Sequence, residues 1–172
     1  FPRVKTYFYK NNNFCIVEEY IYGKTLTEIM LKKIMDNDFS EILLRILENV
    51  KKLHENEIVV YDLSPNNIIV DKNKVYFIDF EYFLLDKNDN RFDRTFGTKG
   101  FFKHNLDLIN RDLYAVISII YYLLKPQEYV DLKNIDKNKD IEFMLGCTEE
   151  EFFKKQYNEK IKQIKQIILQ WL

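Results

Sequence analysis

The chain has 172 residues, of which 47% are hydrophobic and 31% are charged, and its formal net charge is −1. This balance is typical of a folded globular domain, and it excludes a disordered tail or a bundle of membrane helices. A charge so close to zero gives no long-range field for nucleic acid or an anionic membrane, so we predict neither partner. The two cysteines, Cys15 and Cys147, lack metal-ligand spacing and favour a reducing, cytoplasmic compartment over a disulfide framework.

The N-terminal part is predicted to be a β-hairpin. Residues Val4–Lys10 and Phe14–Tyr20 are rich in aromatic and β-branched side chains, and three consecutive asparagines separate them. The chain starts Phe1-Pro2-Arg3 with neither an initiator methionine nor a signal peptide, so we expect it to be an excerpt from a longer product.

Three amphipathic helices are indicated by capping signals and by apolar periodicity. Thr25 and Glu28 have the spacing of a capping box and predict a short helix, and Thr148 and Glu151 predict another near the C-terminus. A longer helix is predicted from Phe39 to Glu55. Its apolar residues recur at helical spacing, namely Phe39, Ile42, Leu43, Ile46, Leu47, Val50 and Leu53.

The middle of the chain combines strands, a loop and a central helix. Two short apolar strands, Ile68–Val70 and Val75–Ile78, are predicted to pair across a polar turn. The stretch Glu81–Asn110 shows no sustained periodicity and predicts a long functional loop. From Arg111 the chain is predicted to be helical. The segment Leu113–Leu124 is apolar nearly all round, as in a buried helix, and falls short of the ~20 residues that a membrane span needs.

Three polar residues stand at fixed places around the predicted strand pair. Asp62 and Asn67 flank the loop before the first strand, and Asp79 follows the second strand, so a hairpin would bring all three together. Phosphoryl transfer needs metal ions to neutralise phosphate oxygens and a carboxylate to orient the attacking hydroxyl. Asn67 and Asp79 supply the hard oxygen ligands that Mg²⁺ takes, and Asp62 suits the orienting or basic role. Each residue alone could simply favour a turn, but their order and spacing together argue for the site.

Tyr61–Val70 and Phe77–Glu81 resemble the catalytic loop (His-Arg-Asp-x-x-x-x-Asn) and the metal loop (Asp-Phe-Gly) of the protein-kinase family. The resemblance implies an α+β, protein-kinase-like fold: a mainly helical large lobe with a catalytic β-hairpin, and a remnant hairpin of the small lobe. Residues 1–22 would then be the end of the small lobe and the hinge, and residues 23–172 the large lobe. ATP and Mg²⁺ are the implied cofactors, and Ser/Thr residues of a peptide or protein the implied substrate.

The segment Val17–Gly23 resembles the hinge between the two kinase lobes. By this resemblance the backbone of Glu19 and Ile21 would hydrogen-bond the adenine of ATP, and Ile69 would form an apolar floor beneath it. Further motifs follow in the family's order.

Phe96–Phe101 resembles the end of a kinase activation segment, and Arg111–Val116 the start of the central helix. The resemblance implies that Thr98 bonds Asp62 and that Asp112 anchors the backbone of the catalytic loop.

His54 and His104 match no metal cluster and are predicted to be structural.

The combination of motifs is most similar to the kinase domain of class III and IV lanthionine synthetases. That subfamily implies phosphorylation of Ser/Thr in a ribosomal precursor peptide, with a lyase domain before the kinase and a cyclase domain after it.

Several positions depart from the family pattern. Val60 and Tyr61 replace the usual His-Arg, Ser64 replaces a Lys, Glu81 replaces the Gly of the metal loop, and Lys103–Asn105 occupies the place of Ala-Pro-Glu. The glycine-rich loop and its partner Lys are absent upstream of the hinge, so we predict that this chain alone is nearly inactive. A pseudokinase scaffold and a small-molecule kinase resembling the aminoglycoside kinases remain the alternatives.

Tyr61 also bears on regulation. The Arg that it replaces pairs, in many protein kinases, with a phosphate on the activation segment. Tyr61 has no positive charge, and although Arg91 and Arg94 could bind a phosphate at Thr95 or Thr98, neither belongs to the catalytic loop. We therefore predict that activation-segment phosphorylation does not switch the enzyme on, and that peptide docking or a neighbouring domain gates it instead.

Overall fold

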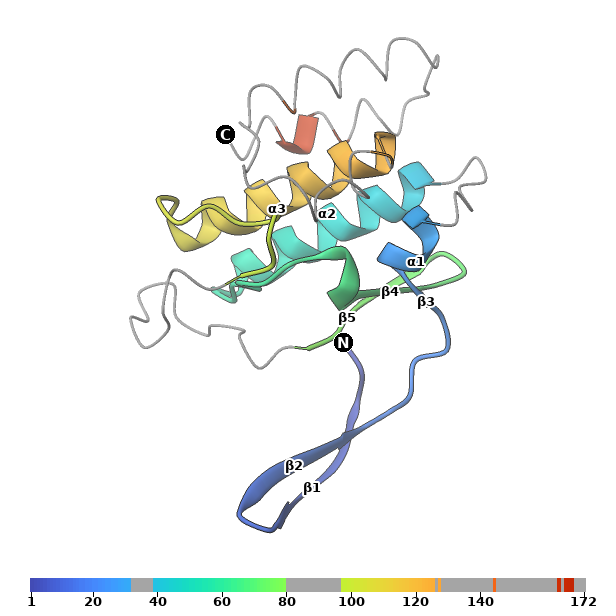
Figure 1. Cartoon of the computed structure of the whole chain (residues 1–172), viewed down its shortest axis with the longest axis vertical. Helices are drawn as coiled ribbons and strands as arrows, with labels where there is room; N and C mark the ends of the chain where they lie inside the picture. The colour runs from blue at the N-terminus through green and yellow to red at the C-terminus, as the bar shows by residue number, and fades with distance from the viewer. Residues whose placement is uncertain are drawn as a thin grey trace.

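The computed structural model describes residues 1–31, 39–79 and 97–125, together with Gln127, Met144, Ile164 and residues 166–168. In this part of the chain a two-stranded hairpin projects from a body built of helices and a small second sheet (Figure 1). The body carries the hydrophobic core, to which α1, α2, α3 and the second sheet all contribute.

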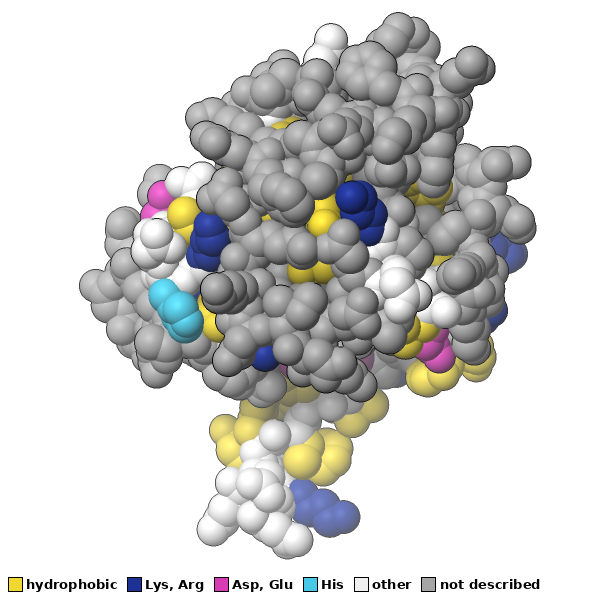
Figure 2. All heavy atoms as spheres, turned by 45° about the horizontal axis from the view of Figure 1, so that its top comes forward, with side chains coloured by type: hydrophobic (Ala, Val, Ile, Leu, Met, Phe, Trp, Pro, Cys, Tyr) yellow, Lys and Arg dark blue, Asp and Glu magenta, His cyan; other side chains and the backbone are white. Residues whose placement is uncertain are grey.

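The projecting hairpin consists of β1 (Val4–Lys10) and β2 (Asn13–Glu18), paired antiparallel. Asn11 and Asn12 link the strands with φ angles of 51° and 62°. Positive φ at both central residues matches the right-handed strand twist, and Asn tolerates it. The predicted hairpin is present, with a second strand that begins and ends one or two residues earlier. Many of its hydrophobic side chains are exposed, and some show in yellow on the projection in Figure 2.

The second sheet has the order β3-β4-β5 and is antiparallel throughout. Its strands are β3 (Lys24–Thr25), β4 (Ile68–Asp71) and β5 (Lys74–Phe77), so the predicted strand pair is confirmed within one residue. Strand β3 was not predicted, because it is only two residues long and ends on a helix-capping residue.

The short helix α1 (Leu26–Leu31) begins with the predicted capping box. The backbone N–H of Thr25 donates to Oε2 of Glu28 at 2.9 Å, and the N–H of Glu28 donates to Oγ1 of Thr25 at 3.2 Å. Two N–H groups that lack a partner in the first turn are thereby satisfied.

The two long helices, α2 (Phe39–Glu55) and α3 (Leu108–Leu124), pack against each other in the body. The bounds of α2 are as predicted, and its apolar stripe faces the core. The predicted start of α3 at Arg111 is wrong, because the Asp107 side chain accepts the backbone N–H of Asn110 at 2.9 Å and starts the helix at Leu108. Every residue from Arg111 to Leu123 is buried, as predicted for a central helix.

Several predictions fall on residues that the structure leaves undescribed. These are Cys147, the capping box at Thr148 and Glu151, and the part of the predicted loop from residue 81 to residue 96. Cys15 is a free thiol on the hairpin. Of the helices in the described ranges, none is long and apolar enough to cross a membrane.

Candidate active site

The loop that carries Asp62 is anchored by hydrogen bonds to a buried carboxylate on α3. Asp112 has a fully buried side chain. Its Oδ2 accepts the backbone N–H of Val60 at 2.8 Å, and its Oδ1 accepts that of Tyr61 at 2.9 Å. Nε2 of His54, from the last turn of α2, lies 2.9 Å from Oδ2. The predicted anchoring by Asp112 is therefore present, and His54 joins the same cluster.

The loop turns sharply at Tyr61. Its φ is 70°, and the N–H of Asp62 donates to the carbonyl oxygen of Val60 at 2.9 Å, which closes a γ-turn around it. This turn is rare and strained for a bulky residue, at a cost of about 1–3 kcal/mol. The bonds from Asp112 hold the strained backbone, so the direction of the following side chain is set by the core.

Asp62 is oriented from a second direction by the segment after residue 97. The backbone N–H of Thr98 donates to Oδ1 of Asp62 at 2.7 Å. The predicted contact between the two residues is confirmed, with the backbone of Thr98 as the donor. Within the described residues Oδ2 of Asp62 accepts no hydrogen bond, so one carboxylate oxygen is left to accept a proton.

Asn67 is tied to the same loop. Its Nδ2 donates to the carbonyl oxygen of Asp62 at 3.1 Å, which leaves Oδ1 as the acceptor on the other side of the amide. Asn67 ends the short 3-10 helix Pro65–Asn67, and its carbonyl oxygen accepts the N–H of Ile78 at 3.0 Å. That bond places the residue before Asp79 directly beside Asn67.

Asp79 completes the predicted trio. It is exposed and has a φ of 61°, so the chain bends sharply where β5 ends. Oδ1 of Asn67 and the carboxylate of Asp79 have no partner in the described ranges and are hard oxygen donors of the kind that Mg²⁺ prefers. The donor chemistry therefore fits the implied metal. Phe80 and Glu81 lie outside the described residues.

Ser64 and the residues at 103–105 replace family residues within the described structure. The Ser64 side chain is fully buried, so its hydroxyl does not face a phosphate as a Lys at this position would. Lys103 lies with its Nζ 5.5 Å from the centre of the Tyr114 ring. His104 is exposed and stacks edge-on against Phe102 at a ring separation of 4.9 Å.

The predicted adenine-binding residues lie on two neighbouring segments. Glu19 is bonded to Arg3 through both its backbone N–H, at 2.9 Å, and its side chain, at 3.0 Å. Of the backbone polar groups of Glu19, only the carbonyl is left for a ligand. Ile21 follows two residues later, and Ile69 lies on β4 opposite Thr25 of β3.

Gly23 brings the two segments together. A Cβ at this position would lie 2.5 Å from the carbonyl oxygen of Val70 and 2.7 Å from Cγ2 of Ile69. Only glycine permits this approach, which places the end of the hinge-like segment against β4. The structure thus ties Asn67 to Asp62 and to Ile78, the residue before Asp79, and it brings the end of the hinge-like segment against Ile69.

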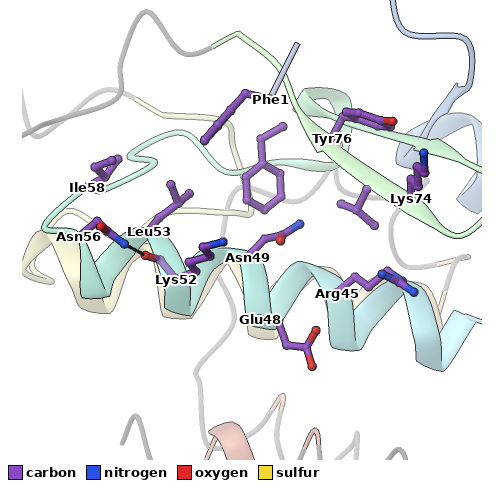
Figure 3. A pocket seen from close by; sticks show the side chains of 12 residues that line it. Phe1, Arg45, Glu48, Asn49, Lys52, Leu53, Asn56, Ile58, Lys74 and Tyr76 are labelled. Atoms are coloured by element: carbon purple, nitrogen blue, oxygen red, sulfur yellow. Dashed lines mark hydrogen bonds between the residues drawn. The ribbon is translucent and has the colours of Figure 1, made fainter. Parts of the chain in front are cut away.

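A pocket of about 560 Å³ lies elsewhere, between α2 and β5. Figure 3 shows Arg45 and Lys52 on α2, and Lys74 and Tyr76 on β5, among the residues that line it. None of the six predicted site residues lines it. Its lining includes one carboxylate, Glu48, and three cations, which is unsuited to binding a phosphate-bound metal ion.

A buried anchor for a loop with Asp and Asn, followed by a strand pair that ends in Asp, is the arrangement of a phosphotransferase of the protein-kinase type. The chain matches the family described as "Protein kinase domain" over residues 3–171. It therefore belongs to the protein kinase family, as the sequence motifs predicted. No finding points to the lanthionine synthetases in particular.

Two curated relatives show the breadth of this similarity. The chain is 31% identical over 144 residues to Serine/threonine-protein kinase D of Synechocystis sp., covering 74% of this chain and 28% of the relative. It is also 31% identical over 135 residues to KEOPS complex subunit Bud32 of Pyrococcus abyssi, covering 75% and 55%. The chain therefore spans between about a quarter and just over half of these relatives.

A solved structure supports the fold. The kinase structure of the yeast RNA Pol II CTD kinase CTDK-1 complex superposes with a TM-score of 0.58 at 17% identity, covering 73% of this chain and 45% of that one. At this identity the likeness shows the protein-kinase-like fold alone.

Proposed function

We propose that the protein transfers the γ-phosphoryl group of ATP to Ser/Thr hydroxyls. The observation that carries this proposal is the position of Asp62, whose Oδ1 is held by the Thr98 N–H at 2.7 Å while Oδ2 has no partner in the described structure. The acceptor oxygen forms a bond to the γ-phosphorus as the bond to the β–γ bridging oxygen breaks and ADP leaves. The hydroxyl proton passes to Oδ2 of Asp62.

The nucleotide would be held by the two groups of residues described above. Asn67 and Asp79 would bind Mg²⁺, which neutralises phosphate charge when present. The carbonyl of Glu19 and the backbone of Ile21 would bind the adenine, whose face would rest on Ile69. The exposed position of Asp79 and the unpartnered Oδ1 of Asn67 support these roles.

We infer further that the substrate is a peptide, since the Thr98 segment that holds Asp62 is the part of a protein kinase that lies beside a peptide acceptor. The motif combination favours a lanthipeptide precursor, with lyase and cyclase domains flanking the kinase. In this proposal residues 1–22 are the end of the small lobe and the hinge, residues 23–172 are the large lobe, and the protein acts in the cytoplasm.

The test uses the intact protein that contains this chain, radiolabelled ATP and Ser/Thr peptides. Asp79→Asn should lower transfer at least a hundredfold because a metal ligand is lost, and Asp62→Asn should lower kcat while leaving nucleotide affinity within about twofold. Near-normal turnover in both variants would contradict the proposal. Nucleotide binding without transfer by the wild type would favour a pseudokinase, and transfer to an aminoglycoside but to no peptide would favour a small-molecule kinase.

A further inference from the structure

Arg111 is a cation buried in the core where α3 passes beneath the Asp62 loop. Its relative exposure is 1%. The guanidinium carbon lies 4.3 Å from the centre of the Tyr61 ring and 5.2 Å from the centre of the Phe102 ring. Both distances are within the range of a cation–π contact, and such contacts strengthen when water is excluded.

The two rings belong to the two segments that meet at Asp62. Tyr61 immediately precedes Asp62 and is the strained residue of the γ-turn. Phe102 packs on Gly97, where a Cβ would come within 2.7 Å of Cγ of its ring. Gly97 immediately precedes Thr98, whose N–H holds Asp62.

These contacts form a closed circuit. It runs from the Asp62 carboxylate to Thr98 and Gly97, through the Phe102 ring to Arg111, and through the Tyr61 ring back to Asp62. Arg111 is the member that joins the two segments through their side chains. It lies next to Asp112, which fixes the same loop through its backbone.

We propose that Arg111 is a positioning residue that holds the Asp62 loop and the Gly97–Phe102 segment in register by stacking between Tyr61 and Phe102. This role rests on the proposed function of Asp62. The proposal also gives Tyr61 a role at the position where many family members carry Arg. Here α3 supplies the cation, Arg111, and the loop supplies the aromatic ring, Tyr61. The register then depends on a permanent side-chain stack and needs no phosphate on the segment.

The first test measures hydrogen exchange of the Thr98 amide, which reports the register without any need for activity. Arg111→Met keeps length and apolar volume, and Tyr61→Leu removes the ring. Each should speed Thr98 exchange about tenfold. Thr98 exchange in the double variant should be no faster than in either single variant, because each single substitution already breaks the contact between Arg111 and Tyr61.

Two matched controls accompany these variants. Tyr61→Phe keeps the ring and should exchange at the wild-type rate. Lys125→Met removes another cation–π contact, at 5.7 Å from the Tyr121 ring at the far end of α3, and should leave Thr98 unchanged. Wild-type protection in both Arg111→Met and Tyr61→Leu, or additive effects in the double variant, would overturn the proposal. If Arg111→Met does not fold, Phe102→Leu replaces it, both as a single variant and in the double variant with Tyr61→Leu.

The second test uses kinetics of the intact protein. Arg111→Met and Tyr61→Leu should lower kcat about tenfold, or about 1.4 kcal/mol of barrier, with the KM for ATP within twofold, since both side chains are buried and do not reach a bound ligand. Phosphatase treatment of the wild type should leave its initial rate within twofold. A tenfold loss on treatment, restored by rephosphorylation of Thr95 or Thr98, would contradict a phosphate-independent register. If the wild type transfers no phosphate at all, the proposed function fails and the exchange experiment alone decides the role of Arg111.

Discussion

The cluster of Asp112 with His54, Val60 and Tyr61 differs from the β1–β2 hairpin in which kind of side chain is buried and which is exposed. Around Asp112 a carboxyl group is fully buried, and two backbone N–H groups and the Nε2 atom of His54 lie within 2.9 Å of its oxygens. On the hairpin large apolar groups lie in the open, with Tyr7 67% and Tyr9 75% exposed. One region hides a polar group and satisfies it, whereas the other exposes apolar groups.

The difference shows where the stability of this chain resides. A buried carboxylate that accepts two backbone N–H groups is costly to disturb, because each N–H left without a partner in the core loses its compensation for desolvation. An exposed aromatic group has little more to lose, since water already reaches it. The Asp62 loop is anchored in the first kind of region. Three substitutions of graded effect on the free energy of unfolding measure the contrast between the two regions.

The largest effect is expected from Asp112→Ala. Removing the carboxylate leaves the buried N–H groups of Val60 and Tyr61 without an acceptor, so the free energy of unfolding should fall by about 3–5 kcal/mol. Denaturant unfolding measures the loss. Asp112→Asn, which retains one acceptor oxygen, should lose less. A loss of unfolding free energy below about 1 kcal/mol in Asp112→Ala would contradict the view that this buried carboxylate is a main source of stability.

An intermediate effect is expected from Gly23→Ala, at the junction between the hairpin and the body. The added Cβ would meet backbone of Val70 at 2.5 Å, so the strands must move apart. The unfolding free energy should fall by about 1–3 kcal/mol, as for other overpacked sites. The neighbouring exposed Lys24→Ala serves as the control and should stay within about 0.5 kcal/mol. Equal stability of the two variants would show that the close approach is not required.

The smallest effect is expected from Tyr9→Thr on the hairpin. Threonine keeps strand propensity, and the change removes an exposed ring whose contact is Phe14, at a ring separation of 5.2 Å. Such a pair contributes about 0.2–1 kcal/mol. Tyr121→Thr, at a buried position in α3, should cost about 3–5 kcal/mol in the same assay. A similar loss of unfolding free energy in both variants would contradict the comparison, because it would show that Tyr9 is packed against other residues.

Most of the site could be read from local sequence, because its residues sit at the ends of short elements. The spacing of Asp62, Asn67 and Asp79 around two apolar strands predicts that they converge, and the structure ties Asn67 to Asp62 and to Ile78. The contact of Thr98 and the anchoring by Asp112 came from family resemblance. Only the structure shows that a backbone N–H supplies the first of these.

What the sequence did not reveal depends on tertiary contacts or on very short elements. Strand β3 is two residues long and exists through pairing with β4. The start of α3 was missed although Asp107 is a typical N-cap, because the preceding loop has no periodicity to mark the boundary. The stack of Arg111 on Tyr61 joins residues from separate elements, and no pattern in a single segment predicts it.

The anchoring of the Asp62 loop by α3 also has a consequence for biosynthesis. The carboxylate of Asp112 lies 52 residues after Val60, and 58 residues after His54. As the polypeptide leaves the ribosome, the strained turn at Tyr61 emerges well before the group that stabilises it. Contacts of such long sequence separation form late in folding. We therefore expect the Asp62 loop to acquire its shape only after α3 has been synthesised, so that nascent chains ending before α3 lack the turn at Tyr61.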